Sequence, residues 1–192
     1  MFRDARGALY AFLKEIGRDM SDCGKGTPLQ EFIGRLGETS LPNWLLAHMN
    51  ELTKNDFDLL KKSARQSSVV YCPRSHAYFG HSPFEFQKLH ELGFNICLGT
   101  DSLVSNQDLS LFAEARAFQK KFPNVSADEI FKMVTTNPAR ALRQENVFGK
   151  MRAGFVADLI AVPVERSTSV FEEIVSFDGS VRWSMIDGRI SA

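Results

Sequence analysis

The chain has 192 residues, and its 23 Lys plus Arg are balanced by 23 Asp plus Glu, so the formal net charge is zero. This length excludes a large multidomain assembly, and the charge balance gives no basic surplus for binding nucleic acid or an anionic membrane. Hydrophobic residues make up 44%, and no apolar run approaches the roughly 20 residues that cross a bilayer. With no signal-peptide pattern at the start, we expect a soluble, cytoplasmic protein.

Three cysteines, Cys23, Cys72 and Cys97, are widely spaced and form no C-x-x-C pair. Their odd number and spacing indicate neither a disulfide framework nor a thiolate zinc site. We therefore expect buried free thiols.

Two helices are predicted before the first strand. Leu9, Phe12, Leu13 and Ile16 recur at helical spacing. A second helix begins at Thr27-Pro28-Leu29-Gln30, which has the pattern of a capping box with proline at the first helical position, and Gly37 can close it.

A repeated unit follows, in which an apolar run of strand length ends in polar residues and leads into a helix. The strands are predicted at residues 44–47, 69–72 and 94–98. The helices that follow them are expected to begin near Thr53 and Ser82, and to contain Leu109 and Phe118. Apolar strands that alternate with helices predict a parallel sheet covered by helices.

The pattern changes in the last quarter of the chain. A helix opens at Ser126 and is expected to be interrupted at Asn137-Pro138. Strands are then predicted at 158–162 and 181–186, the second meeting the hairpin signal Asp187-Gly188. We interpret residues 1–150 as a helix-covered α/β domain and residues 151–192 as a small β appendage.

Polar residues at the strand ends are the candidates for chemistry, because the carboxyl ends of parallel strands form the ligand-binding edge of such sheets. His48, Arg74, Ser75 and Asp101 are expected there together. A histidine and an aspartate on neighbouring strand ends can hold a divalent ion, or can move protons to and from an attacking water.

Structural roles for the same residues are equally open. His48 can be an ordinary hydrogen-bonded side chain, and Asp101 or Ser102 can cap the next helix. Arg74 and Ser75 can merely line a loop. The remaining histidines are expected outside the site, His76 and His81 in a loop and His90 in a helix.

An ordered set of motifs resembles the amidohydrolase superfamily, within it the branch of cytosine deaminases, S-adenosylhomocysteine deaminases and triazine chlorohydrolases. The motifs are Leu-Leu-Ala-His48, Cys72-Pro73-Arg74-Ser75, Gly99-Thr100-Asp101-Ser102, Thr136-Asn137-Pro138-Ala139-Arg140-Ala141-Leu142 and Gly154-Phe-Val-Ala-Asp158. Each one is short, and their common order is what makes the resemblance specific.

The resemblance implies a (β/α)8 barrel that holds one divalent metal, zinc or iron, at the carboxyl ends of its strands. Asp101 matches the aspartate of strand eight, which binds the metal and takes a proton from the attacking water. His48 matches the histidine of strand six, which contacts the water or the substrate and in some relatives joins the metal. We assign His48 to catalysis and substrate contact first, and to coordination second.

Parts of the family pattern are absent from this sequence. There is no His-x-His, nothing resembles the His-x-x-Glu motif of the family's strand five, and His76 stands where an asparagine commonly follows the Cys-Pro-x-Ser motif. We therefore expect the C-terminal portion of a longer enzyme, about strands six to eight of the barrel plus the β appendage. Such a portion would bind no metal alone, and would self-associate or pair with the missing N-terminal half.

The function implied for the complete enzyme is metal-dependent hydrolysis of a carbon–nitrogen bond. The substrate would be a small nitrogen heterocycle that loses its amino group as ammonia, and the isolated chain would be inactive. One alternative is hydrolytic dechlorination at the same type of site. Another is a non-catalytic α/β interaction module in which His48 and Asp101 are structural.

Overall fold

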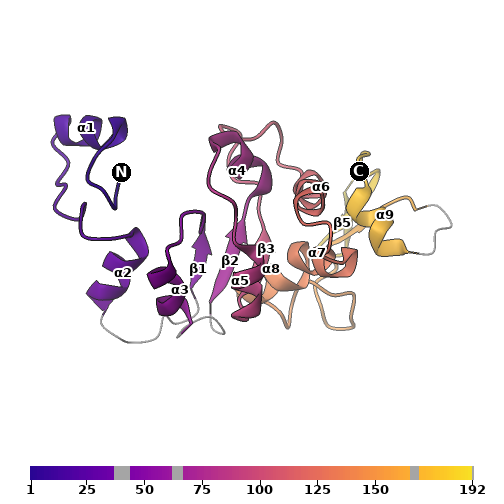
Figure 1. Cartoon of the computed structure of the whole chain (residues 1–192). Helices are drawn as coiled ribbons and strands as arrows, with labels where there is room; N and C mark the ends of the chain where they lie inside the picture. The colour runs from indigo at the N-terminus through magenta and orange to yellow at the C-terminus, as the bar shows by residue number, and fades with distance from the viewer. Residues whose placement is uncertain (37–43, 62–66, 165–168, 192) are drawn as a thin grey trace.

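The computed structural model describes residues 1–36, 44–61, 67–164 and 169–191. Two small sheets and the helices around them follow one another along the chain (Figure 1). In chain order the first half contains α1 (Ala8–Glu15), α2 (Pro28–Leu36), β1 (Leu45–Ala47), α3 (Lys54–Leu60), β2 (Ser68–Tyr71), α4 (Pro73–Phe79), α5 (Phe86–Glu91) and β3 (Asn95–Leu98). The second half contains α6 (Leu111–Lys121), α7 (Ala127–Val134), α8 (Thr136–Ala141), β4 (Leu159–Ala161), α9 (Val170–Ser176), β5 (Trp183–Ile186) and β6 (Arg189–Ser191).

The first sheet is parallel, with strand order β1-β2-β3, and confirms the predicted α/β organisation. Every residue of β3 and three of four in β2 are buried, as expected for strands apolar on both faces. Strand β1 lies at one edge of the sheet and is mostly exposed. The core beside these strands is apolar and includes Leu60, Val69, Tyr71, Phe84, Phe86, Leu89, Ile96, Phe118, Ile130 and Met133.

The helix after β2 differs from the prediction. The helix predicted to begin near Ser82 corresponds to α5, which begins at Phe86. Helix α4 was not predicted: it starts directly after the strand at Pro73 and ends at Gly80, where φ is 64°. Proline suits the first helical position because its fixed φ is helical and its missing N–H has no partner there, and glycine tolerates the left-handed conformation at a helix end. Arg74 and Ser75 consequently belong to a helix rather than a loop.

The predicted capping residues are largely confirmed. Thr53 forms a capping box with Asp56 at the start of α3, and the Thr27 hydroxyl accepts a hydrogen bond from the backbone of Gln30 in α2. Ser126 accepts the Glu129 N–H at the start of α7. Gly37, expected to close α2, lies outside the described residues.

The predicted break at Asn137-Pro138 is displaced. Helix α7 ends before Thr135, whose φ of −127° and ψ of −85° are not helical, and α8 then begins at Thr136. Pro138 falls in the first turn of α8, where a missing backbone N–H costs nothing. The break therefore precedes the proline by a few residues.

The second sheet is antiparallel, with strand order β4-β5-β6. The hairpin signal is confirmed, because Asp187 and Gly188 have φ values of 49° and 74°, the positive values that a tight two-residue hairpin requires. Helix α9, between β4 and β5, was missed by the sequence interpretation, although its N-cap Ser169 accepts the Glu172 N–H. Strand β6 is exposed throughout.

Helix α1 has no buried residues, and Figure 1 shows that it lies apart from the parallel sheet, near the N-terminus. Leu9, Phe12 and Ile16, predicted as its apolar face, are all more than half exposed.

Of the helices in the described ranges, none is long and apolar enough to cross a membrane.

Candidate functional site

Two of the predicted site residues meet at the carboxyl edge of the parallel sheet. His48 follows β1 and Asp101 follows β3, and His48 Nε2 lies 3.7 Å from Asp101 Oδ2. This distance is too long for a direct hydrogen bond but short enough for one water or substrate atom to contact both groups. Ser75, in the first turn of α4 after the central strand β2, lies between them in sheet order.

Both residues have an unusual backbone. His48 has φ 56° and Asp101 has φ 59°, which places two of the five described non-glycine residues of positive φ at this site. Such conformations cost of order 1–3 kcal/mol and persist where the surrounding structure holds them, often at functional sites.

The β3 end approaches β2 closely. The Gly99 N–H donates to Tyr71 O at 3.0 Å, which continues the strand pairing beyond Leu98. A side chain at residue 99 would place its Cβ 2.8 Å from Val70 Cγ1, so only glycine allows this approach. The backbone that carries Asp101 is thereby fixed against the central strand.

Asp101 is held by two hydroxyl groups. Ser75 Oγ donates to Asp101 Oδ2 at 2.7 Å, and Ser105 Oγ lies 3.4 Å from the same oxygen and 2.9 Å from Ser75 Oγ. The hydrogen bond from Ser75 is the main cause that lowers the pKa of Asp101, and the Ser102 backbone and the nearby His48 act in the same direction. Asp101 is therefore a carboxylate at neutral pH, which is the form that binds a cation or accepts a proton.

His48 is more open than Asp101. Its side chain is 50% exposed, against 26% for Asp101. The loop after it is held by Asn50, whose N–H donates to His48 O at 2.8 Å and which is itself buried. The imidazole is therefore positioned largely through its own backbone.

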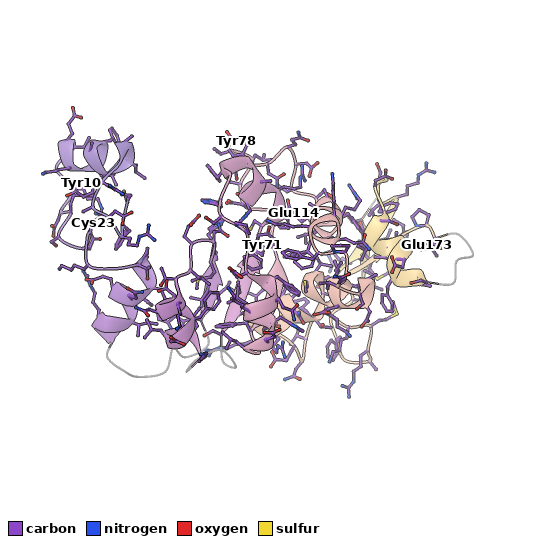
Figure 2. The ribbon with its side chains drawn as sticks, viewed as in Figure 1. Tyr10, Cys23, Tyr71, Tyr78, Glu114 and Glu173 are labelled. Atoms are coloured by element: carbon purple, nitrogen blue, oxygen red, sulfur yellow. The ribbon has the colours of Figure 1, made fainter. Side chains whose placement is uncertain are left out.

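The buried carboxylate of Glu114 links two of the segments that carry the site residues. Glu114 of α6 accepts the Arg74 N–H at 3.0 Å and the Asn106 side-chain amide at 2.6 Å, where α4 meets α6 (Figure 2). Burial raises the pKa of Glu114. Asn106 also donates to Thr100 O at 2.8 Å, so Glu114 connects the start of α4 to the loop that carries Asp101.

The Arg74 guanidinium lies beside two acidic side chains, Asp108 and Glu114. Its Nη1 lies 2.6 Å from Asp108 Oδ1 and 3.9 Å from Glu114 Oε1. The suggestion that Asp101 or Ser102 caps the next helix is wrong, because Ser110 is the N-cap of α6.

The other histidines have separate surroundings. His76 was expected in a loop, but it is a buried residue of α4 whose Nδ1 lies 3.1 Å from Asn50 Oδ1. His81 is in a loop, as predicted, with Nδ1 3.7 Å from Glu51 Oε1. His90 is in α5, as predicted, with Nε2 3.0 Å from a carboxylate of α7.

Sequence reasoning missed three supporting residues, Asn50, Ser105 and Glu114. Asn50 and Ser105 lie in loops whose conformation no periodicity predicts. Glu114 sits in the amphipathic helix α6 at 0% exposure, where its spacing resembles that of Ala115 and Phe118. An acidic residue on the apolar face of a predicted helix was the available signal.

The described residues fit one corner of a metal centre and do not complete it. They contain no group of three or more His, Cys, Asp and Glu side chains that could hold an ion. Catalytic zinc usually has three protein ligands and a water. The ionised Asp101 suits one of these positions and His48 is near enough for a second, so further ligands would have to come from other residues.

Two cavities within the described residues lie away from the site. One of about 610 Å³ is apolar and lies between α6, α7 and α9, and another of about 630 Å³ lies beside α7 and β4. Neither His48 nor Asp101 lines them.

A histidine and an ionised aspartate at the carboxyl edge of a helix-covered parallel sheet define a site of the kind that α/β enzymes use. The sequence pattern of the amidohydrolase family matches residues 13–190. The chain belongs to this family, which confirms the resemblance drawn from its motifs.

Individual relatives agree with this assignment. A 5-methylthioadenosine/S-adenosylhomocysteine deaminase of Pyrococcus furiosus is 33% identical over 147 residues, covering 73% of this chain and 33% of that protein. The zinc-bound adenosine deaminase of Xanthomonas campestris superposes with a TM-score of 0.66 and 26% identity, over 76% of this chain and 36% of that structure. Aminofutalosine deaminase of Helicobacter pylori superposes over 99% of this chain and 48% of its own, with a TM-score of 0.77 and 18% identity, which shows the shared fold.

The chain spans about a third of the length of the curated relatives that it matches. Its fold is the α/β fold of the amidohydrolase barrels, represented here by three adjacent parallel strands and their helices.

Proposed function

We propose that this chain forms the C-terminal part, about strands six to eight, of an amidohydrolase barrel that removes an amino group from a nitrogen heterocycle. The observation that supports it most directly is the 3.7 Å approach of His48 Nε2 to Asp101 Oδ2 in a chain of this family. Three parallel strands cannot close a barrel, which needs eight strands and roughly 250 residues. The remaining strands would come from residues outside this chain.

In the completed site Asp101 would hold the divalent ion, zinc or iron, together with ligands from the other strands. When bound, such an ion would supply hydroxide at neutral pH by lowering the pKa of a coordinated water. Asp101, kept ionised by Ser75, takes a proton from the attacking water. His48, whose Nε2 lies 3.7 Å from Asp101 Oδ2, orients the water and stabilises the negative charge that develops on the substrate.

The substrates named for the relatives suggest the first compounds to assay. Curated relatives are 5-methylthioadenosine/S-adenosylhomocysteine deaminases, so the proposed substrate class is an aminated purine nucleoside or a similar heterocycle. The complete protein is incubated with 5-methylthioadenosine, S-adenosylhomocysteine and adenosine, and released ammonia is measured. A chlorotriazine with detection of chloride tests the dechlorination alternative.

Asp101→Asn is the decisive variant. It should lower the rate of ammonia release by about 10²–10⁴-fold, the range typical of a lost acid–base group, and should also lower the metal content of the purified protein. Asp58→Asn is the matched control, because Asp58 is an exposed carboxylate of α3 that pairs with Lys61. If Asp101→Asn changes neither metal content nor activity, the chain is a non-catalytic module.

The isolated chain should show no turnover, since it supplies at most two of the ligands. Ammonia release by this chain alone, abolished by a chelator, would overturn the proposal that the site is completed by other residues.

A further inference from the structure

A buried contact joins helix α4 to the loop after His48. His76 Nδ1 and Asn50 Oδ1 are 3.1 Å apart, and the two residues are only 5% and 7% exposed. An amide oxygen only accepts hydrogen bonds, so the imidazole Nδ1 is the donor. Asn50 in turn donates its N–H to His48 O. Two hydrogen bonds thus run in sequence from His76 to the backbone of His48.

The residue before His76 supports the other half of the site. Ser75 Oγ donates to Asp101 Oδ2 after β3, whereas His76 contacts Asn50 in the loop after β1. Consecutive residues of α4 therefore reach the carboxyl ends of both outer strands of the sheet. This is possible because α4 follows β2, the strand between β1 and β3. The first turn of α4 is therefore the shared support of His48 and Asp101.

His48 needs such support more than Asp101 does. It follows an edge strand, its side chain is half exposed, and its φ of 56° is unfavourable for a residue with a side chain. We propose that His76 is a positioning residue which, through Asn50, holds the left-handed turn at His48 and so keeps its imidazole facing Asp101. The proposal rests on the proposed function in that His48 takes part in the reaction.

A simple packing role for His76 is the competing explanation. Its ring lies 5.3 Å from that of Tyr71 and 5.6 Å from that of His81, measured between centroids. If packing is what matters, a side chain of similar volume should replace the imidazole. If donation from Nδ1 matters, asparagine should replace it better, because the amide NH₂ of asparagine can occupy the position of Nδ1.

His76→Leu and His76→Asn separate the two roles. We expect the amide of Asn50 to exchange with solvent about tenfold faster in His76→Leu, relative to the amide of Ile130 in α7, and within about threefold of the wild type in His76→Asn. Ile130 donates to Ser126 O far from the site and reports overall unfolding. This measurement uses NMR on the chain itself and requires no turnover.

Asn50→Ala gives a second route that leaves the His76 ring in place. It should accelerate exchange at the amide of residue 50 as His76→Leu does. In the complete enzyme, His76→Leu should lower kcat at least tenfold with KM within threefold, and His76→Asn should restore most of kcat. Equal exchange in the Leu and Asn variants, or better protection with leucine, would overturn the proposal.

The two proposals can fail separately. If the complete wild-type enzyme releases no ammonia, the proposed reaction is wrong, yet the exchange experiment still decides whether His76 holds the loop. If the enzyme is active and His76→Leu retains its kcat, His76 has no positioning role.

Discussion

The two sheets of this protein are of equal strand number but differ in how they are covered. In the parallel sheet β2 and β3 are almost wholly buried, whereas no residue of β4, β5 or β6 is. Helices α6, α7 and α8 pack against β3, while the antiparallel sheet leaves Ile160, Ile186 and Ile190 more than half exposed. The more deeply buried sheet is therefore the one that carries Asp101.

Stability should follow this difference, and the largest effect is expected in β3. Ile96 is 2% exposed and Ile190 of β6 is 66% exposed. Ile96→Ala should lower the free energy of unfolding by about 2–5 kcal/mol, because it removes buried methyl groups and leaves a cavity. Ile190→Ala should change it by less than about 0.5 kcal/mol. Urea denaturation measures both, and equal losses would show that the antiparallel sheet is buried against something in solution.

The buried support of the site should have an intermediate effect. Glu114 Oε2 accepts the Arg74 N–H and Oε1 accepts the Asn106 amide, so in Glu114→Gln the new NH₂ group faces one of these two donors. We expect a loss of about 1–3 kcal/mol in the free energy of unfolding, the range for a buried polar group left without its partner.

Glu85→Gln is the matched control for Glu114→Gln. Glu85 is a partly exposed residue that pairs with Lys88, so its substitution should cost less than about 0.5 kcal/mol. Similar losses in the two variants would mean that Glu114 does not hold α4 and the Asp101 loop together.

The smallest expected effect is a change in the pKa of Asp101. Ser75→Ala removes the hydrogen bond that contributes most to the low pKa of Asp101. A hydrogen bond donated to a carboxylate stabilises its charged form, so its removal should raise the pKa of Asp101 toward the ordinary value. NMR titration of the Asp101 carboxyl carbon measures the change.

The same variant has a consequence for stability. Because the pKa of folded Asp101 is lowered, its ionisation stabilises the fold above the ordinary value of 3.8, and this contribution is lost as the pH falls through the folded pKa. Ser75→Ala should reduce the contribution. Ser82→Ala, which removes a hydroxyl bonded to Glu51 instead, should leave the titration of Asp101 unchanged. An unchanged Asp101 pKa in Ser75→Ala would show that this hydrogen bond is not kept in solution.

Local patterns were sufficient to predict most elements of the parallel half. Apolar runs of strand length placed β2 and β3, and the capping residues Thr53 and Ser126 placed the starts of two helices, because these signals depend on neighbours in the chain. The helix predicted near Ser82 begins at Phe86 as α5, and the preceding helix α4, which opens at Pro73, was not predicted. Helix α9 had no marked periodicity and was missed.

The amino-acid sequence by itself determined the alternation of strands and helices, the family, and the identity of His48 and Asp101 as candidates. Each of these follows from residues close together in the chain or from the order of short motifs. Tertiary structure alone decided that the two residues lie 3.7 Å apart, and that Ser75, Asn50, His76 and Glu114 support them. These contacts join segments that are tens of residues apart, and they form only when packing of the sheet and helices brings those segments together.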